Sequence, residues 1–257
     1  MIRTLFARSC KATRLVGVLA YIKAARLAGD QPPVYLDVGA RGGLSPSWRL
    51  ARQVGLITPA YCEPDPAEAE RLTTADPNAI VIPYAFGQIA ETRTLYITRE
   101  PGRSSLLFPE CPSVIKQGRE DWSVEREISV QVVRLDDVWS GFASRLPVFI
   151  KVDVQGFELE VLRGAGKLFD EEILCAELEA PLVPFYKGQP TLQTVFDFIF
   201  MSKFDLVKIK PQGLLDNGIW EFNIFFIRRG YHEDGRVKLW KLVNNVPNHQ
   251  RLVTYGY

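Results

Sequence analysis

The chain has 257 residues, of which 47% are hydrophobic and 24% are charged, and its formal net charge is +1. These values are ordinary for a globular protein, and the length suits one large α/β domain. There is no basic excess of the kind that dedicated nucleic-acid-binding proteins carry, so we expect no nucleic-acid partner. The four cysteines form no CxxC or Cys/His cluster. This spacing excludes a zinc ribbon or disulfide framework and predicts a reducing, cytoplasmic setting.

Residues 1–30 form a segment of their own. Basic residues recur between Arg3 and Arg26 with no acid before Asp30, and apolar residues recur at helical spacing, which predicts an amphipathic helix. Its apolar stretch is too short to span a bilayer, and the scattered basic residues argue against a cleaved signal. We expect a helix that packs on the domain with a solvated basic face. Peripheral membrane contact through this helix is the alternative.

From residue 31 to about residue 230, strand-like and helix-like segments alternate. This order predicts a Rossmann-like, mostly parallel sheet with helices on both faces. The first expected strand is Val34–Val38, an apolar run that stops at glycines, and a helix over 45–54 follows. A second strand ends at 61–63, a helix runs through Leu72, and 79–85 reads as a third strand.

The alternation breaks in an insertion at about 93–134. Residues 93–98 and 128–134 alternate polar and apolar, which predicts an inserted antiparallel β pair. A loop as long as the one between them, 99–127, is usually a lid, a binding loop or a disordered segment, and we interpret it as a substrate lid.

After the insertion the alternation of strands and helices resumes and continues to about residue 228. Strands are expected at 148–152, 173–178, 206–209 and 222–227, with the last one antiparallel, and helices at 156–162 and 192–200. No periodicity is evident after Gly230, so 231–257 is interpreted as a C-terminal tail.

The first βα turn, residues 37–43, reads Asp-Val-Gly-Ala-Arg-Gly-Gly. Its glycines let backbone approach a ligand at the carboxyl edge of the sheet. Arg41 stands where G-x-G-x-x-G needs glycine, and no segment gives a P-loop, which argues against dinucleotide and phosphate sites. Asp37 would repel phosphate but suits a cationic amino acid end, and Glu63 can accept hydrogen bonds from both ribose hydroxyls. The pair indicates an adenosine ligand with a positive tail, the alternative being a turn-capping Asp37 and a surface Glu63.

A second segment places charges in an apolar strand. Lys151 and Asp153 alternate along one face of 148–152 and its carboxyl end, which is costly unless they are paired or open to a cleft. Such residues usually belong to a site, although a structural ion pair is the alternative.

Residues 151–164, Lys-Val-Asp-Val-Gln-Gly-Phe-Glu-Leu-Glu-Val-Leu-Arg-Gly, resemble the signature of FkbM-type methyltransferases, K-[IV]-D-[IV]-[EQ]-G-x-E-x-x-V-L-x-G. The turn at 37–43 resembles that family's cofactor turn, although Arg41 replaces its commoner Asn. Further matches follow in family order between about 34 and 210: Glu63-Pro64-Asp65-Pro66, Ser104-Ser105-Leu106, Leu135-Asp136-Asp137, and Glu177 with Tyr186-Lys187-Gly188-Gln189-Pro190.

This resemblance implies a class I methyltransferase fold that binds S-adenosylmethionine across the carboxyl edges of its strands. It also implies methyl transfer to a hydroxyl of a sugar, polyketide or similar metabolite, so the expected partner is a small-molecule or glycan acceptor. The expected cofactor-binding residues are Asp37, Gly39, Ala40, Arg41, Gly43, Glu63, Pro64 and Ala85.

The motifs offer carboxylates but no histidine as a base. We expect Asp153 to act as base or to orient the acceptor, with Lys151, Glu158 and Glu177 setting its pKa. Asp153 and Glu177 are also candidate ligands of a Mg²⁺ ion whose third ligand the sequence does not identify. Two rival interpretations remain: a nicotinamide-dependent oxidoreductase, and a non-catalytic cofactor-binding module recruited by its basic helix. The sequence does not predict the oligomeric state.

Overall fold

The computed structural model describes residues 31–246, apart from 111, 113–117, 143–146, 213 and 216–217. The predicted basic helix at 1–30 and the end of the predicted tail, 247–257, lie outside the described residues. Within the described part, no helix is long and apolar enough to cross a membrane.

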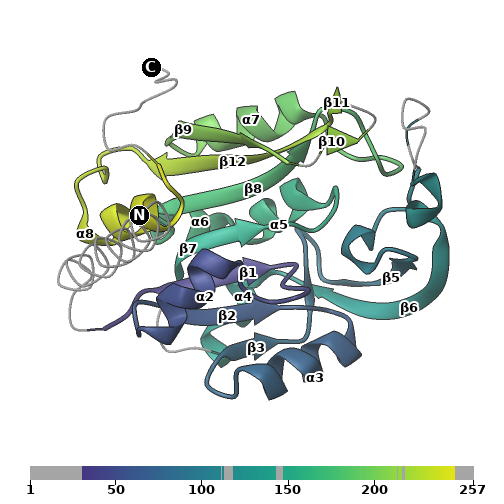
Figure 1. Cartoon of the computed structure of the whole chain (residues 1–257), viewed down its shortest axis with the longest axis horizontal. Coiled ribbons are helices and arrows are strands. Elements are labelled where there is room, and N and C mark those ends of the chain that lie inside the picture. The colour runs from purple at the N-terminus through teal and green to yellow at the C-terminus, as the bar shows by residue number, and fades with distance from the viewer. Residues whose placement is uncertain are drawn as a thin grey trace, which may run out of the picture.

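A central sheet organises the fold, and in the described residues it has seven strands in the order β3-β2-β1-β7-β8-β12-β9 (Figure 1). β12 is antiparallel to both of its neighbours, and the other neighbouring strands pair in parallel. The predicted Rossmann-like sheet with an antiparallel last strand is confirmed. The strands are β1 (Val34–Val38), β2 (Thr58–Cys62), β3 (Ile80–Ile82), β7 (Pro147–Val152), β8 (Cys175–Pro181), β9 (Phe204–Pro211) and β12 (Glu221–Arg228).

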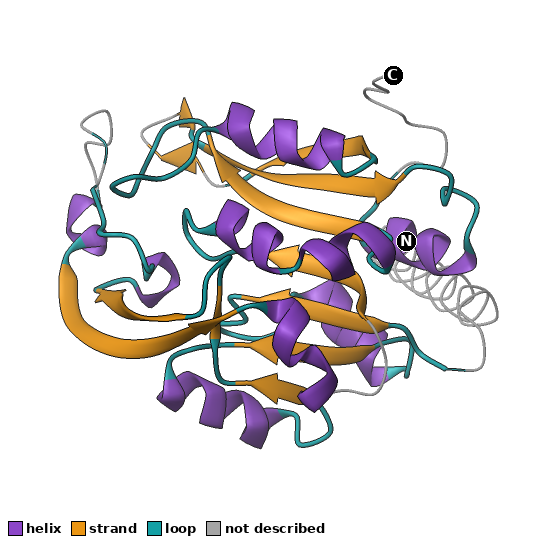
Figure 2. Cartoon of the chain, turned by 180° about the vertical axis from the view of Figure 1, so that it is seen from behind, coloured by secondary structure: helices purple, strands orange, loops and turns teal. Residues whose placement is uncertain are grey.

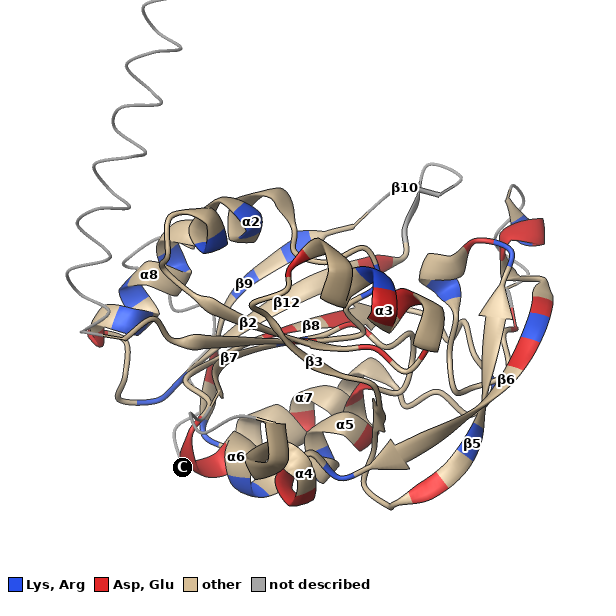
Figure 3. Cartoon of the chain, turned by 90° about the horizontal axis from the view of Figure 1, so that it is seen from below, with Lys and Arg blue, Asp and Glu red and all other residues tan. Residues whose placement is uncertain are grey.

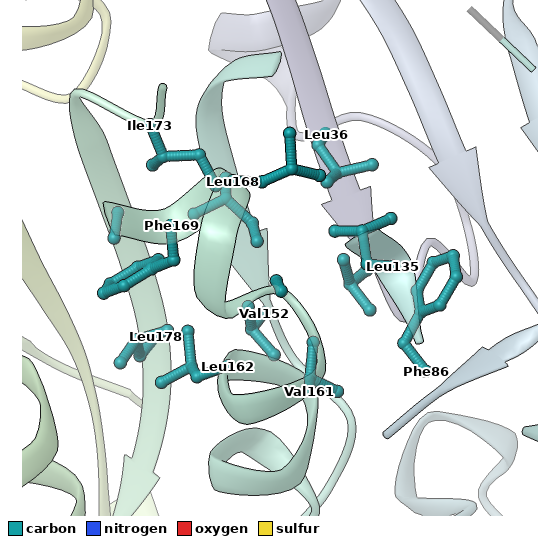
Figure 4. Close-up of a cluster of buried hydrophobic side chains, with 14 of the residues drawn as sticks. Leu36, Phe86, Leu135, Val152, Val161, Leu162, Leu168, Phe169, Ile173 and Leu178 are labelled. Atoms are coloured by element: carbon teal, nitrogen blue, oxygen red, sulfur yellow. The ribbon is translucent and has the colours of Figure 1, made fainter. Parts of the chain in front are cut away.

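Helices cover both faces of this sheet (Figure 3). One face carries α2 (Pro46–Gln53), α3 (Pro66–Ala75) and α8 (Gly235–Val243), and the other carries α4 (Leu135–Phe142), α5 (Glu158–Gly164), α6 (Gly166–Glu171) and α7 (Leu192–Met201). Each layer encloses its own apolar core, because alternate strand residues point to opposite faces. Figure 4 shows the core beneath α4 to α7, which includes Leu36, Val152, Leu162, Phe169 and Leu178.

The insertion forms a separate small sheet in the order β4-β6-β5, beside the central sheet (Figures 1 and 2). Its strands are β4 (Ala85–Phe86), β5 (Glu91–Thr98) and β6 (Val124–Val133), with the short 3₁₀ helices η1 (Pro101–Arg103) and η2 (Arg119–Trp122) between β5 and β6. β5 and β6 are antiparallel, as predicted. The single strand expected over 79–85 is wrong: β3 ends at Ile82, and Ala85 pairs with β6 instead. Pro83 interrupts the run because it lacks the N–H that a ladder needs.

The chain after β12 contains a helix that the sequence pattern did not reveal. Asp234 caps α8 by accepting a hydrogen bond from the Arg236 N–H, and Val237 and Trp240 are buried against the sheet. Lys241 is buried among these apolar residues and donates to the His232 carbonyl at 3.2 Å, so it interrupts the apolar stripe that would have indicated a helix. A short hairpin, β10 (Leu214–Leu215) with β11 (Gly218–Ile219), precedes β12.

Candidate functional site

A cleft opens at the carboxyl ends of β1, β2 and β7. In the sheet, β1 lies between β2 on one side and β7 on the other, so the strand order reverses at β1. Open α/β sheets bind ligands at such a switch point. The cleft holds about 780 Å³ of empty space, a volume that includes open solvent at its mouth. Its walls come from the ends of β1, β2 and β7 and from the insertion, including residues 101–102 and 104–106.

The turns after β1 and β7 are joined by close backbone contact. Gly39 has φ +81°, and a Cβ built on it would lie 1.9 Å from the Asp153 carbonyl oxygen. The Asp153 N–H donates to the Val38 carbonyl at 3.0 Å, and the Gly39 and Ala40 N–H groups both donate to the Cys62 carbonyl. Only glycine fits this position, and the contact fixes the cofactor turn against the strand end that carries Asp153.

Glu63 lies at the end of β2 and lines the cleft, although its residue surface is only 3% exposed. Its Oε1 accepts a hydrogen bond from the Asp65 N–H at 2.9 Å and lies 3.9 Å from Arg41 Nη2. Burial raises the pKa of Glu63 to about 7, against the opposing effects of that hydrogen bond and of Arg41. A ligand that donates a hydrogen bond to this carboxyl group would therefore stabilise its ionised form.

Arg41 ties three parts of the cleft together. Its Nη2 lies 2.9 Å from Asp65 Oδ2, and Arg126 of β6 approaches the same oxygen at 3.2 Å. Asp65 also caps α3, because its side chain accepts from the Ala67 N–H. The arginine that replaces the commoner Asn of the resembling family thus connects the cofactor turn to the start of α3 and, through Asp65, to the insertion.

Asp37, Lys151 and Asp153 form a charged row across β1 and β7. Lys151 Nζ lies 3.4 Å from Asp37 Oδ1 and 3.1 Å from Asp153 Oδ2. Burial alone would lower the pKa of Lys151, but the charges of Asp153 and Asp37 outweigh it and raise that pKa. Burial raises the pKa of Asp37, against the opposing charge of Lys151. Asp37 is therefore engaged with Lys151, and it is not among the residues that line the cleft.

Glu177 and Glu158 are buried behind the cleft. Glu177 pairs in register with Lys151 on the neighbouring strand, and its Oε1 accepts from Asn223 Nδ2 at 2.7 Å. Glu158 Oε1 accepts from the N–H groups of Val154 at 3.2 Å and Gly156 at 3.0 Å. Burial raises the pKa of Glu177, and it raises the pKa of Glu158 to about 7. Glu158 thus holds the turn that follows β7.

The structure divides the predicted site residues into two groups. Those that line the cleft are Gly39, Arg41, Glu63, Pro64, Ala85 and Asp153. In the described chain, the other predicted site residues surround or support the cleft without lining it: Asp37, Ala40, Gly43, Lys151, Glu158 and Glu177.

Several residues at the site escaped the sequence analysis. Glu179 is two residues beyond Glu177 on β8 and shares its face of the sheet, a spacing that could have been used. Gln155 is inside the signature itself. Tyr84, Phe86 and Leu95 also line the cleft and carried no such signal. Ser104, Ser105 and Leu106 line it as well, and the sequence marked them only as a family match without a role.

The structure gives no support to the predicted Mg²⁺ ion. In the described residues, no group of three or more His, Cys, Asp and Glu side chains converges as a metal site requires. Asp153 is engaged by Lys151 and Gln155, and Glu177 by Asn223.

The sequence was compared with models of known protein families. Residues 37–209, more than half of the chain, match the model described as the methyltransferase FkbM domain. The chain belongs to the FkbM methyltransferase family. The match confirms the resemblance found in the signature segment, and it spans the cofactor turn, the insertion and the strands up to β9. A search of curated proteins finds no match.

The chain also aligns with solved methyltransferase structures, at low sequence identity and with TM-scores below 0.5. An FkbM methyltransferase from Methylobacillus flagellatus KT aligns with a TM-score of 0.49 and 17% identity over 76% of this chain and 43% of that one. This chain therefore spans less than half the length of that relative. A TehB-like methyltransferase from Corynebacterium glutamicum aligns with a TM-score of 0.40 and 10% identity over 87% and 97% of the two chains. Magnesium protoporphyrin IX methyltransferase from Synechocystis aligns with a TM-score of 0.42 and 10% identity over 82% and 79%.

Proposed function

We propose that this chain binds S-adenosylmethionine in the cleft and transfers its methyl group to a hydroxyl of a small-molecule or glycan acceptor. The family supplies the reaction class. The observation that carries the assignment is Glu63, a buried carboxylate at the end of β2 that lines a cleft at the switch point of the sheet.

The residues of the cleft fit this cofactor. In the described chain, the two close contacts of the Glu63 carboxylate both involve Oε1, which leaves Oε2 for the ribose hydroxyls. Tyr84, Ala85 and Phe86 provide an aromatic and apolar wall next to it, which suits an adenine ring. Asp153 belongs to the lining formed by the end of β7, so the cofactor would reach from Glu63 toward Asp153.

Methyl transfer to an alcohol needs a proton acceptor and close alignment. A carbon–oxygen bond forms while the carbon–sulfur bond of the sulfonium breaks, its electron pair stays on sulfur, and the hydroxyl proton must leave. Asp153 is the one predicted catalytic residue that lines the cleft among those described, and we assign it as the group that receives this proton. Burial alone would raise the pKa of Asp153, but Lys151, Glu179 and Gln155 lower it, which keeps the carboxylate ionised and able to accept.

Calorimetric titration tests the cofactor assignment. The chain should bind S-adenosylmethionine and S-adenosylhomocysteine but not NADH. Glu63→Ala should abolish binding, because the ribose hydroxyls lose their acceptor. Glu70→Ala, an exposed acid on the neighbouring α3, is the matched control and should bind normally. Preference for NADH, or unchanged affinity in Glu63→Ala, would contradict the proposal.

Turnover distinguishes an enzyme from a non-catalytic cofactor-binding module. A panel of sugars and small alcohols is incubated with the chain and S-adenosylmethionine, and S-adenosylhomocysteine is measured. Acceptor-dependent formation that Asp153→Asn abolishes, while that variant still binds S-adenosylhomocysteine, would support catalysis. Equal formation by wild type and Asp153→Asn would remove Asp153 from the catalytic role.

A further inference from the structure

Gln155 connects two carboxyl groups that lie next to the cleft. Its Nε2 donates to Asp153 Oδ1 at 2.9 Å and also to Glu179 Oε2. A primary amide carries two N–H donors, so one Gln155 side chain can serve both carboxyl groups at once. Asp153 Oδ1 and Glu179 Oε2 therefore accept from the same nitrogen, which holds the two carboxyl groups close together. Two carboxylates have only acceptors and repel each other, so a proton on one of them relieves the repulsion.

The orientation of the Gln155 amide is fixed from its other end. The Tyr186 hydroxyl lies 2.7 Å from Gln155 Oε1 and 3.0 Å from the Arg103 carbonyl oxygen. A flipped amide would place Oε1 against the oxygens of Asp153 and Glu179 and its donors against the phenol. Tyr186 is nine-tenths buried or more, so water does not easily replace this contact.

The backbone of Gln155 is held in a conformation that a glutamine rarely adopts. Its φ is +57°, in the left-handed region, which is strained for a glutamine and persists only where the surroundings enforce it. Glu158 accepts hydrogen bonds from the residues on both sides, Val154 and Gly156. Ser105 of the insertion donates to the Gln155 carbonyl at 2.7 Å. These contacts aim the side chain at the carboxyl pair instead of letting the turn relax.

We propose that Gln155 is a positioning residue whose amide holds Asp153 and Glu179 as a carboxyl pair sharing one proton, with Asp153 as the ionised member facing the cleft. The inference rests on the proposed function, and it adds Glu179, Gln155 and Tyr186 to the machinery. Glu179 carries the proton of the pair, so Asp153 stays ionised and can receive the proton of an acceptor hydroxyl.

The electrostatics of the pair agree with this division. Burial and the charge of Asp153 raise the pKa of Glu179 well above its ordinary value, whereas the pKa of Asp153 is lowered because Lys151, Glu179 and Gln155 outweigh its burial. Two adjacent carboxyl groups titrate as a unit, and the donor set decides which one ionises first. The charged and titratable groups that interact electrostatically with the pair are Tyr35 and Asp37 of β1, Lys151 of β7, Glu158 of α5, Glu177 of β8, Tyr186, and Glu221 of β12, and Arg103 of the insertion acts on Glu221.

The test follows the two carboxyl groups by ¹³C NMR in protein labelled at the Asp and Glu carboxyl carbons, with signals assigned through Asp153→Asn and Glu179→Gln. In the wild type, Glu179 should remain protonated at neutral pH while Asp153 is ionised. Gln155→Leu removes both donors, so the Asp153 titration should move up by about one pH unit or more. Gln131→Leu is the control, since its Nε2 bonds only Thr92 on the exposed face of the β5–β6 pair.

Tyr186→Phe provides a second, milder variant. It removes only the hydroxyl that fixes the amide, so the Asp153 titration should shift in the same direction by less. The inference would be overturned if the titration curves of Asp153 and Glu179 were unchanged in both variants. If Gln155→Leu does not fold, unchanged curves in Tyr186→Phe alone would overturn it. No cofactor is present in these titrations, so their outcome is separate from that of the calorimetry, where failure of the wild type to bind S-adenosylhomocysteine defeats the proposed function itself.

Discussion

Gly39 and Asp153 meet backbone to backbone where β1 and β7 end, so closely that a Cβ on residue 39 would lie 1.9 Å from the Asp153 carbonyl oxygen. This contact places the cofactor turn and the proposed proton acceptor in one rigid unit. The position of Asp153 relative to the cleft therefore depends on a glycine that is 114 residues earlier in the chain.

Gly39→Ala should destabilise the fold severely. The new Cβ meets backbone that cannot move without separating β1 from β7, and we expect a loss of about 3 kcal/mol or more in the free energy of unfolding. Gly42→Ala is an unusually close control, because Gly42 has the same φ of +81° but open space around its missing Cβ. It should lose only the left-handed strain, about 1 kcal/mol. Urea denaturation of both variants measures the difference, and equal losses would show that the Asp153 contact is unimportant.

Binding of S-adenosylhomocysteine should weaken as the pH falls through 7. Burial raises the pKa of Glu63 to about 7, and the ionised form is the one that accepts hydrogen bonds from both ribose hydroxyls. At pH 6 most of the carboxyl is protonated and at pH 8 most is ionised, so the affinity should be about tenfold lower at pH 6. Glu63→Gln should bind weakly with a flat profile. A wild-type affinity that is constant from pH 6 to 8 would place the ribose elsewhere.

Lys151→Met should make stability depend on pH in a new way. The substitution leaves the buried Asp37 without its cation and removes one from Asp153, so the raised pKa of Asp37 should rise further and the lowered pKa of Asp153 should also rise. An acid with a raised folded-state pKa loses stability as the pH rises through that range, so the variant should be less stable at pH 8 than at pH 5.

The expected size of this effect depends on how buried the ion pair is, and an exposed ion pair serves as the control. At pH 8 we expect Lys151→Met to lose about 3 kcal/mol, because removing one partner of a buried pair leaves uncompensated charge. Lys238→Met breaks a pair with the exposed Glu233 and should cost little. Urea denaturation at pH 5 and pH 8 compares the two. A loss in Lys151→Met that does not grow with pH would mean that Asp37 and Asp153 do not depend on Lys151 for their charge.

The insertion is predicted to act as a lid, and Ser105 is where it attaches to the turn after β7. Ser105 is 1% exposed and donates to the Gln155 carbonyl, and its Oγ accepts from the Leu107 N–H at 3.0 Å. Ser105→Ala should speed amide hydrogen exchange in the described segment 99–110, whereas Ser129→Ala on β6 should not. Bound S-adenosylhomocysteine should slow exchange in this segment of the wild type. Exchange that is indifferent to the ligand would argue against a lid.

The sheet was predictable because each strand is an apolar run with a clear stop. Val34–Val38 ends at the glycines of the cofactor turn, and the charges of Lys151 and Asp153 mark the end of β7, so periodicity and turn residues alone locate both. The boundary at Pro83 was missed because the apolar run continues through it in sequence, although the residues before it pair in the central sheet and those after it pair in the small sheet. α8 was missed because the buried Lys241 interrupts the apolar pattern from which a helix is recognised.

The residue types of the site could be predicted from the sequence, but which of them line the cleft and which support its wall could not. Asp37, Lys151 and Glu158 stand out by residue type in the motifs, yet whether such a group lines a cleft or supports its wall depends on pairing across strands. The hydrogen bond from Gln155 to Glu179 joins residues on β8 and in the turn after β7, and single-sequence periodicity does not reveal which partners a side chain meets. Gln155 and Tyr186 were part of the matched motifs, but their roles became evident only through these contacts.

The most direct test is a crystal structure of the chain with S-adenosylhomocysteine. The account predicts adenosine in the cleft, with the ribose hydroxyls within hydrogen-bond distance of Glu63, the adenine beside Tyr84 to Phe86, and the sulfur on the side of Asp153. A ligand bound outside this cleft, or one bound in reverse with its amino acid end at Glu63, would contradict it.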